Sequence, residues 1–148
     1  MCYPHGQMTY MKTLLVVIAM FCTAAAHGQS DTLTIDRRLQ DCLDSSANHT
    51  TIGMSECIQK ATVLWDAELN RHYQELLQVL SGDQKKQLRA AQRQWIRYRD
   101  QELEFSNNLY YDMGGSMWIP VAAERRLQLT KQRALELAGY LENLRMGR

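Results

Sequence analysis

The sequence predicts an all-α domain, namely an elongated antiparallel three-helix bundle with a short N-terminal arm that a disulfide ties to it. Apolar residues recur at steps of three and four over long stretches, which is the spacing of one helix face. Two short breaks separate these stretches, and helices joined by short connections run antiparallel. The two prolines, Pro4 and Pro120, both lie outside the two long central segments, which favours helices over many short strands.

The first long helix is expected from Thr51 to about Leu80, after a polar stretch at 29–50 in which only a short helix, Asp36–Leu43, is predicted. Ser81 and Gln84 fit a capping box, in which each side chain bonds the other residue's backbone N–H, so a second helix should start there. The apolar stripe of the first helix comprises Cys57, Ala61, Leu64, Trp65, Leu69, Tyr73, Leu76 and Leu80.

The second helix is expected to continue to about Tyr110, with Leu88, Ala91, Trp95, Tyr98 and Leu103 on its inner face. A break with two adjacent glycines follows, and Pro120 suits the first turn of a third helix. The apolar stripe of this helix has the most regular period, with Ala123, Leu127, Thr130, Ala134, Leu137, Leu141 and Leu144. Helices of about 25–30 residues each would make the bundle elongated.

The N-terminal segment has the pattern of a secretory signal. Lys12 precedes a short apolar run, Leu14–Phe21, and small residues follow at 22–26. We expect residues 1–28 to be the signal peptide, with translation starting at Met11, and residues 29–148 to form the helical domain. The run is too short to span a bilayer, so no stable membrane span is expected in the mature chain.

Charge argues against a nucleic-acid partner. The leader carries one of the 17 basic residues and none of the 16 acidic ones, so the mature chain is formally neutral. A nucleic-acid-binding domain usually has a strong basic excess. No nucleic-acid partner is therefore expected.

Two cysteines, Cys42 and Cys57, remain after the predicted leader. An even pair in an exported protein indicates a disulfide, and closing this loop should stabilise the fold by about 3 kcal/mol in the chain-entropy model. The alternative is a metal or redox site, but the mature chain has no CxxC motif and only two histidines, His49 and His72. His72 lies on a polar stretch and is expected at the surface. We expect no metal and no cofactor.

Polar residues lie one helical turn from core aromatic and leucine residues in three clusters. One hypothesis makes Asp66 or Glu68 part of a carboxylate pair for hydrolysis, which needs a cleft and a defined separation. The other hypothesis is a structural network between helices, in which Arg99 and Arg133 bond carboxylates and amides. Its expected members are Asp66, Asn70, Gln92, Arg99, Asp100, Thr130, Arg133 and Glu136. We expect the protein not to be an enzyme.

The break between the second and third helices is the candidate partner-binding loop. A tight tip needs glycine for positive φ, but it does not need several aromatic residues, and exposed Tyr and Trp are typical interface anchors. The alternative is that Tyr110 and Trp118 cover the end of the core. The candidate binding residues are Tyr110, Tyr111, Gly114, Gly115, Ser116 and Trp118.

Four blocks occur in order along the chain after Cys57. They are Trp65-Asp66-x-x-Leu69-Asn70-x-x-Tyr73, Ala91-Gln92-Arg93-x-Trp95-x-x-Tyr98-Arg99-Asp100, Gly114-Gly115-Ser116 and Leu129-Thr130-x-x-Arg133-x-x-Glu136-Leu137. In these blocks the chain resembles the LprI-like lysozyme-inhibitor family of small bacterial exported proteins, from residue 42 to about residue 141. Many relatives carry a second cysteine pair, and here Leu103 and Arg125 stand near those positions.

The resemblance implies a helical domain outside the cytoplasm, periplasmic or secreted, and binding to a lysozyme. It supplies no catalytic residue. The leading hypothesis is an exported binding protein that blocks a muramidase through the 110–118 loop. The alternative is a non-inhibitory structural or accessory protein of the bacterial envelope that binds another envelope protein through a helical face.

Overall fold

The computed structural model describes residues 27–147. Nearly all of the predicted signal peptide, residues 1–26, lies outside the described residues. The chain divides into two compact units, residues 1–33 and residues 34–148. The helical bundle is the second unit, and the first contributes only the beginning of helix α2 to the described part of the chain.

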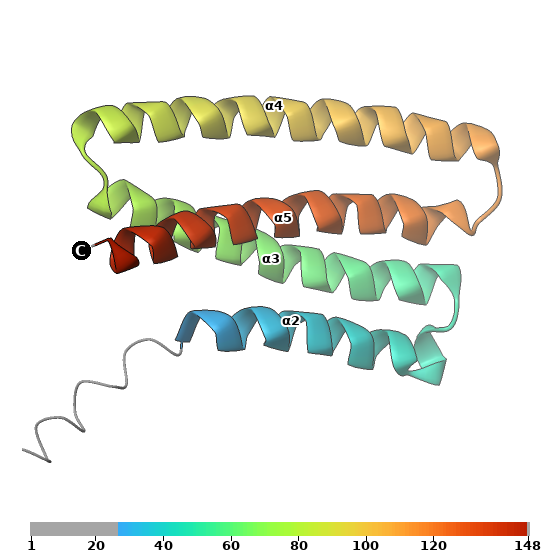
Figure 1. The fold of residues 1–148 in the computed structure, drawn as a ribbon. Coiled ribbons are helices and arrows are strands. Elements are labelled where there is room, and N and C mark those ends of the chain that lie inside the picture. The colour runs from blue at the N-terminus through green and yellow to red at the C-terminus, as the bar shows by residue number, and fades with distance from the viewer. Residues whose placement is uncertain (1–26, 148) are drawn as a thin grey trace, which may run out of the picture. The chain divides into compact units, whose positions relative to one another are not determined.

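The described residues form helices and no strand (Figure 1). Helix α2 spans His27–Asp44, a short 3-10 helix, η1, spans Ser46–Asn48, and the long helices are α3 (Thr51–Val79), α4 (Gly82–Met113) and α5 (Trp118–Met146). The predicted all-α class and the three long helices are confirmed, with ends close to those expected. The capping box of Ser81 and Gln84 is present at the start of α4, and Pro120 lies in the first turn of α5.

The core lies mainly between α3 and α5. Trp65 and Leu76 from α3 and Leu127 and Leu137 from α5 are each less than 2% exposed. Burying an aliphatic or aromatic side chain of this size stabilises a fold by about 1.5–3 kcal/mol. These helices therefore provide most of the stability, and α4 buries only Gln92, Leu103 and Ser106.

The expected short N-terminal arm is wrong, because this segment forms a fourth helix, α2, of 18 residues. Ile35 is buried in the core, and Leu39 packs against the same core from one helical turn further on. Asp36 forms an ion pair with Lys131 of α5 at 2.6 Å. Two apolar residues four positions apart thus give an otherwise polar segment a buried face.

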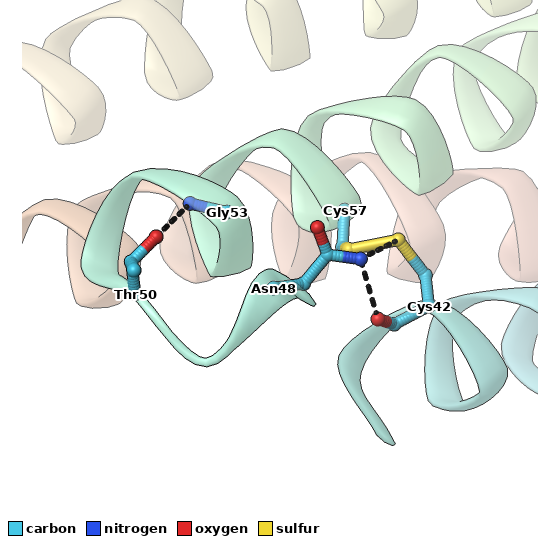
Figure 2. Close-up of a disulfide and its surroundings, with 5 residues drawn as sticks. All are labelled: Cys42, Asn48, Thr50, Gly53 and Cys57. Atoms are coloured by element: carbon cyan, nitrogen blue, oxygen red, sulfur yellow. Dashed lines mark hydrogen bonds between the residues drawn. A yellow bond between two sulfur atoms is a disulfide. The ribbon is translucent and has the colours of Figure 1, made fainter. Parts of the chain in front are cut away.

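The predicted disulfide between Cys42 and Cys57 is confirmed, and it links α2 to α3 (Figure 2). The connection between these helices is tight. The side-chain amide of Asn48 donates to the backbone oxygen of Cys42 at 2.9 Å, and the Thr50 hydroxyl caps α3 by accepting from the Gly53 N–H at 3.0 Å. A Cβ on Gly53 would lie 2.7 Å from the Asn48 Cα, so only glycine fits there.

Two expectations about side-chain positions are wrong. On α4 the inner face contains Gln92, Trp95 and Leu103, whereas Tyr98 is half exposed. The reason is that α4 packs along one narrow face on α5, and the positions of Ala91 and Tyr98 turn outward. His72 is buried rather than at the surface, because it lies one turn from the core residues Leu69 and Leu76 on the inner face of α3.

Candidate functional site

Two glycines shape the turn between α4 and α5. Gly114 has φ +66° and Gly115 has φ +89°, and nothing lies within 4 Å of a Cβ added to either residue. Glycine is therefore required at both positions by the backbone conformation and not by a lack of space, because residues with a Cβ rarely adopt these values of φ. The N–H of Gly114 donates to the Tyr111 oxygen at 3.1 Å, which closes the end of α4.

An aromatic stack joins the two sides of this turn. The rings of Tyr110 and Trp118 lie 5.8 Å apart between centroids with an interplanar angle of 5°, and both residues are half-buried. The two rings thus pack on each other across the turn, and neither is among the side chains packed against the main core. Tyr111 points elsewhere and is 84% exposed.

An apolar surface extends over the turn beyond the residues expected from the sequence. We call it the tip surface, and it consists of five exposed side chains: Leu109, Tyr111, Met113, Met117 and Ile119. Between Phe105 and Ala123 the sequence has a single charged residue, Asp112. Sequence reasoning had not included Leu109 and Ile119, although this long uncharged stretch could have pointed to them.

The polar residues of α4 and α5 meet at Arg133. Its Nε donates to the Gln92 side-chain oxygen on α4 at 3.0 Å, and its Nη1 pairs with Glu136 at 3.0 Å. The guanidinium carbon also lies 5.9 Å from the centre of the Trp95 ring. Arg133 and Gln92 are both buried, so this contact fixes the register of α4 on α5.

The other residues of the expected network make local contacts. Arg99 pairs with its neighbour Asp100 at 2.7 Å and lies over the Trp95 ring at 5.2 Å. Asn70 donates to Asp66 at 3.0 Å within α3. Thr130 donates to the backbone oxygen of Arg126. The eight residues thus form two pairs within a helix, Asp66 with Asn70 and Arg99 with Asp100, and one group of three around Arg133, whose bond to Gln92 connects two helices, while Thr130 bonds none of the others.

An ion pair joins α4 to α5 beside Leu103 and at Arg125, the positions that the family resemblance associates with a second cysteine pair. Arg125 of α5 donates through Nε and Nη2 to one oxygen of Glu102 on α4, at 3.1 and 2.5 Å. This hydrogen bond raises the pKa of Arg125. Leu103 is buried beside Glu102. The flanks of the tip are therefore joined by an ion pair between α4 and α5.

A groove of about 500 Å³ lies on the bundle and is lined by side chains from α3, α4 and α5. Asp66 is the one carboxylate among its lining residues, and Arg99, Arg126 and Thr130 also line it. Glu68, the other acid considered for hydrolysis, pairs instead with Arg71. The groove does not bring together the two carboxylates that a glycosidase mechanism uses.

Within residues 27–147 no three His, Cys, Asp or Glu side chains are grouped so that they could hold a metal ion. The same part of the chain contains no helix long and apolar enough to cross a membrane.

These features define a disulfide-linked, all-helical domain with exposed apolar side chains at a glycine turn. The chain belongs to the LprI lysozyme inhibitor family, whose model matches residues 42–137. The matched range includes both cysteines and the whole tip surface. The resemblance inferred from the sequence is thereby confirmed.

The chain is also similar to a solved structure, the crystal structure of an uncharacterized protein from Burkholderia thailandensis. The two share 28% sequence identity with a TM-score of 0.69, over 74% of this chain and 54% of that one. The chain thus spans about half the length of that structure. None of the curated proteins compared with the chain matches it.

Proposed function

We propose that the protein acts outside the cytoplasm as a lysozyme inhibitor and that its tip surface binds a muramidase. Membership of the LprI lysozyme inhibitor family supports the class of activity. The disulfide between Cys42 and Cys57 supports an oxidising compartment, because such bonds are rare in the cytoplasm. The signal pattern at residues 1–28 agrees with export to the periplasm or beyond.

The main observation in support of placing the binding site at the tip surface is the exposure of Tyr111. A tyrosine that is 84% exposed at a turn places a large ring in solvent, where it gives the fold little stability. Tyrosine anchors are enriched at interface centres, where they fill pockets on a partner. Met113 and Met117 lie on either side of the glycines and supply flexible apolar contacts.

The turn also has a shape that suits entry into a cleft. Gly114 and Gly115 have no side chains, and Ser116 is exposed, so the end of the hairpin is narrow. A muramidase cleft must accommodate sugar rings between its catalytic carboxylates. We propose that Gly114, Gly115 and Ser116 enter such a cleft and that Tyr111 stacks where a sugar ring would lie.

Trp118 has a different role in this proposal. Its ring is stacked on Tyr110 and half-buried, so it holds the two flanks of the turn together instead of reaching the partner. Replacing Trp118 would therefore disturb the turn itself. Removal of the Tyr111 ring should instead weaken binding and leave folding unchanged.

Lysis of a cell-wall suspension by several lysozymes tests this function, with the oxidised protein added at increasing ratios. We expect saturable inhibition near a 1:1 ratio. Tyr111→Ala should weaken inhibition at least tenfold, which corresponds to the loss of one interface anchor. Tyr140→Ala is the matched control, since Tyr140 is also exposed, at 53%, but lies in the last turns of α5.

Equal inhibition by the Tyr111→Ala and wild-type proteins would refute the tip as the binding site. Absence of inhibition of every lysozyme type, with the protein shown to be helical and oxidised, would refute the inhibitor proposal. The chain would then be better described as an accessory protein of the envelope that binds through a helical face.

A further inference from the structure

Helix α4 has a strongly divided charge distribution. After Asp83 in its first turn, residues 84–99 contain six basic residues and no acid, whereas residues 100–113 contain four acidic residues and no base. This order opposes the helix dipole, which favours acids near the N-terminus and bases near the C-terminus. The basic residues are Lys85, Lys86, Arg89, Arg93, Arg97 and Arg99, and the acidic ones are Asp100, Glu102, Glu104 and Asp112.

Most of the outward charges on α4 have no ion-pair partner among residues 27–147. The series Lys85, Arg89, Arg93 and Arg97 repeats at steps of four, and none of these side chains forms an ion pair with a described residue. Like charges at this spacing destabilise a helix. Glu104, in the acidic half, is also unpaired within the described part of the chain.

Helix α3 shows that the chain can pair charges within a helix. Arg71 bonds Glu68 and Glu75 at three- and four-residue steps, at 2.5 and 2.7 Å. Within α4, by contrast, the described ion pairs are Lys86 with Asp83 and Arg99 with Asp100, and the other basic residues of its outer surface have none. Its two halves are complementary to each other but cannot meet within one straight helix.

Helix α4 also exposes apolar groups, on the face next to its charged one. Ala91, Tyr98 and Phe105 recur every seven residues, and all three are exposed. A seven-residue repeat of this kind is the pattern by which helices pack along one another. Only three of the 32 residues of α4 are buried in the part of the chain that the structure describes, so its outward faces can contact another helix.

We propose that the outer surface of α4 binds α4 of a second copy of the chain in an antiparallel, two-fold symmetric pair. Antiparallel pairing places the basic half of each helix against the acidic half of the other. An axis between Tyr98 and Arg99, close to the middle of α4, brings Arg93 opposite Glu104 and Arg97 opposite Asp100 of the second copy. A two-fold interface uses the same patch on both subunits, and each contact therefore occurs twice.

The charge distribution favours a second copy over other occupants. An anionic polymer or an anionic membrane would bind the residues from Lys85 to Arg97, but Glu104 and Asp112 on the same helix would repel it. A second α4 satisfies both halves at once. Exposed ion pairs contribute little individually, so the pair is expected to be reversible and weakened by salt.

Sedimentation velocity of the full exported chain tests the proposal at concentrations from about 1 to about 200 µM, a range suited to small reversible interfaces. We expect dimers at low ionic strength and monomers at high salt. Arg93→Glu and Glu104→Arg should each raise the dissociation constant at least tenfold. Lys60→Glu, an equivalent charge change at an exposed site on α3, should leave it unchanged.

Charge exchange makes the test independent of folding defects. The double variant Arg93→Glu/Glu104→Arg should dimerise like the wild type, and an equimolar mixture of the two single variants should form a heterodimer. Wild-type protein that stays monomeric at the highest concentration in low salt would overturn the proposal. A double variant that is as monomeric as the single variants would also overturn it. The same holds if the Glu104→Arg protein binds vesicles of anionic phospholipid while none of the proteins forms a dimer.

Discussion

Replacing Arg133 with methionine should weaken the attachment of α4 to α5. The guanidinium of Arg133 donates to the buried side-chain oxygen of Gln92 at 3.0 Å and lies 5.9 Å from the Trp95 ring. Methionine keeps much of the volume but removes the donor and the charge. The buried oxygen of Gln92, a residue 7% exposed, would then have no partner.

The size of the effect follows from these contacts. A hydrogen bond from a charged donor contributes about 1.5–3 kcal/mol, and a cation over an aromatic ring contributes about 0.5–1 kcal/mol. Part of the Arg133 charge is compensated by Glu136 at 3.0 Å. We therefore expect Arg133→Met to lower the free energy of unfolding by about 2–4 kcal/mol.

Urea unfolding followed by circular dichroism measures this change. Gln92→Leu should also destabilise the protein, because it leaves the buried guanidinium with one partner fewer. The double variant Arg133→Met/Gln92→Leu removes both polar groups, so it should recover about 1–2 kcal/mol relative to the sum of the single changes. Strictly additive single effects would refute the view that this buried pair holds α4 in register.

Two further outcomes follow from buried groups of α3 and its neighbours. Gly53→Ala should destabilise the protein by about 1–3 kcal/mol in thermal unfolding, because the new Cβ would lie 2.7 Å from the backbone of Asn48. Gly82→Ala is the control, since nothing lies within 4 Å of a Cβ added there, and it should be neutral or slightly stabilising. Burial, reinforced by the charge of Arg71, lowers the pKa of His72 in the folded protein. The unfolded chain therefore binds the proton more readily than the folded chain does. Stability should thus fall as the pH drops through about 6.5, the pKa of an unperturbed histidine. Urea titrations at several pH values should show this loss reduced in His72→Gln, and an unchanged pH profile would contradict it.

The sequence was sufficient to predict the three long helices because their signals are local. The capping box at Ser81 marks the end of α3 and the beginning of α4, and Gly114 and Gly115 mark the turn before α5. The disulfide followed from the number of cysteines and the export signal. Each of these features depends on residues close together in the sequence or on a simple count.

The features that the sequence did not reveal depend on contacts between distant segments. Helix α2 is stabilised by Ile35, which is buried among residues of α3 and α5, and a single apolar pair in a polar stretch gives little periodic signal. Tyr98 fits an apolar stripe by spacing, but the packing of α4 on α5 leaves it half exposed. The exposure of Tyr111 and the stacking of Trp118 likewise depend on how the turn closes.

The small buried area of α4 has a consequence for the motions of the protein. Helix α3 has eight buried residues and α5 has seven, but α4 has three. Segments with few buried contacts open at lower free energy than the rest of a fold. Helix α4 should therefore detach and reattach as a unit while α3 and α5 stay packed, and its backbone amides should exchange with solvent long before those around Trp65 and Leu137.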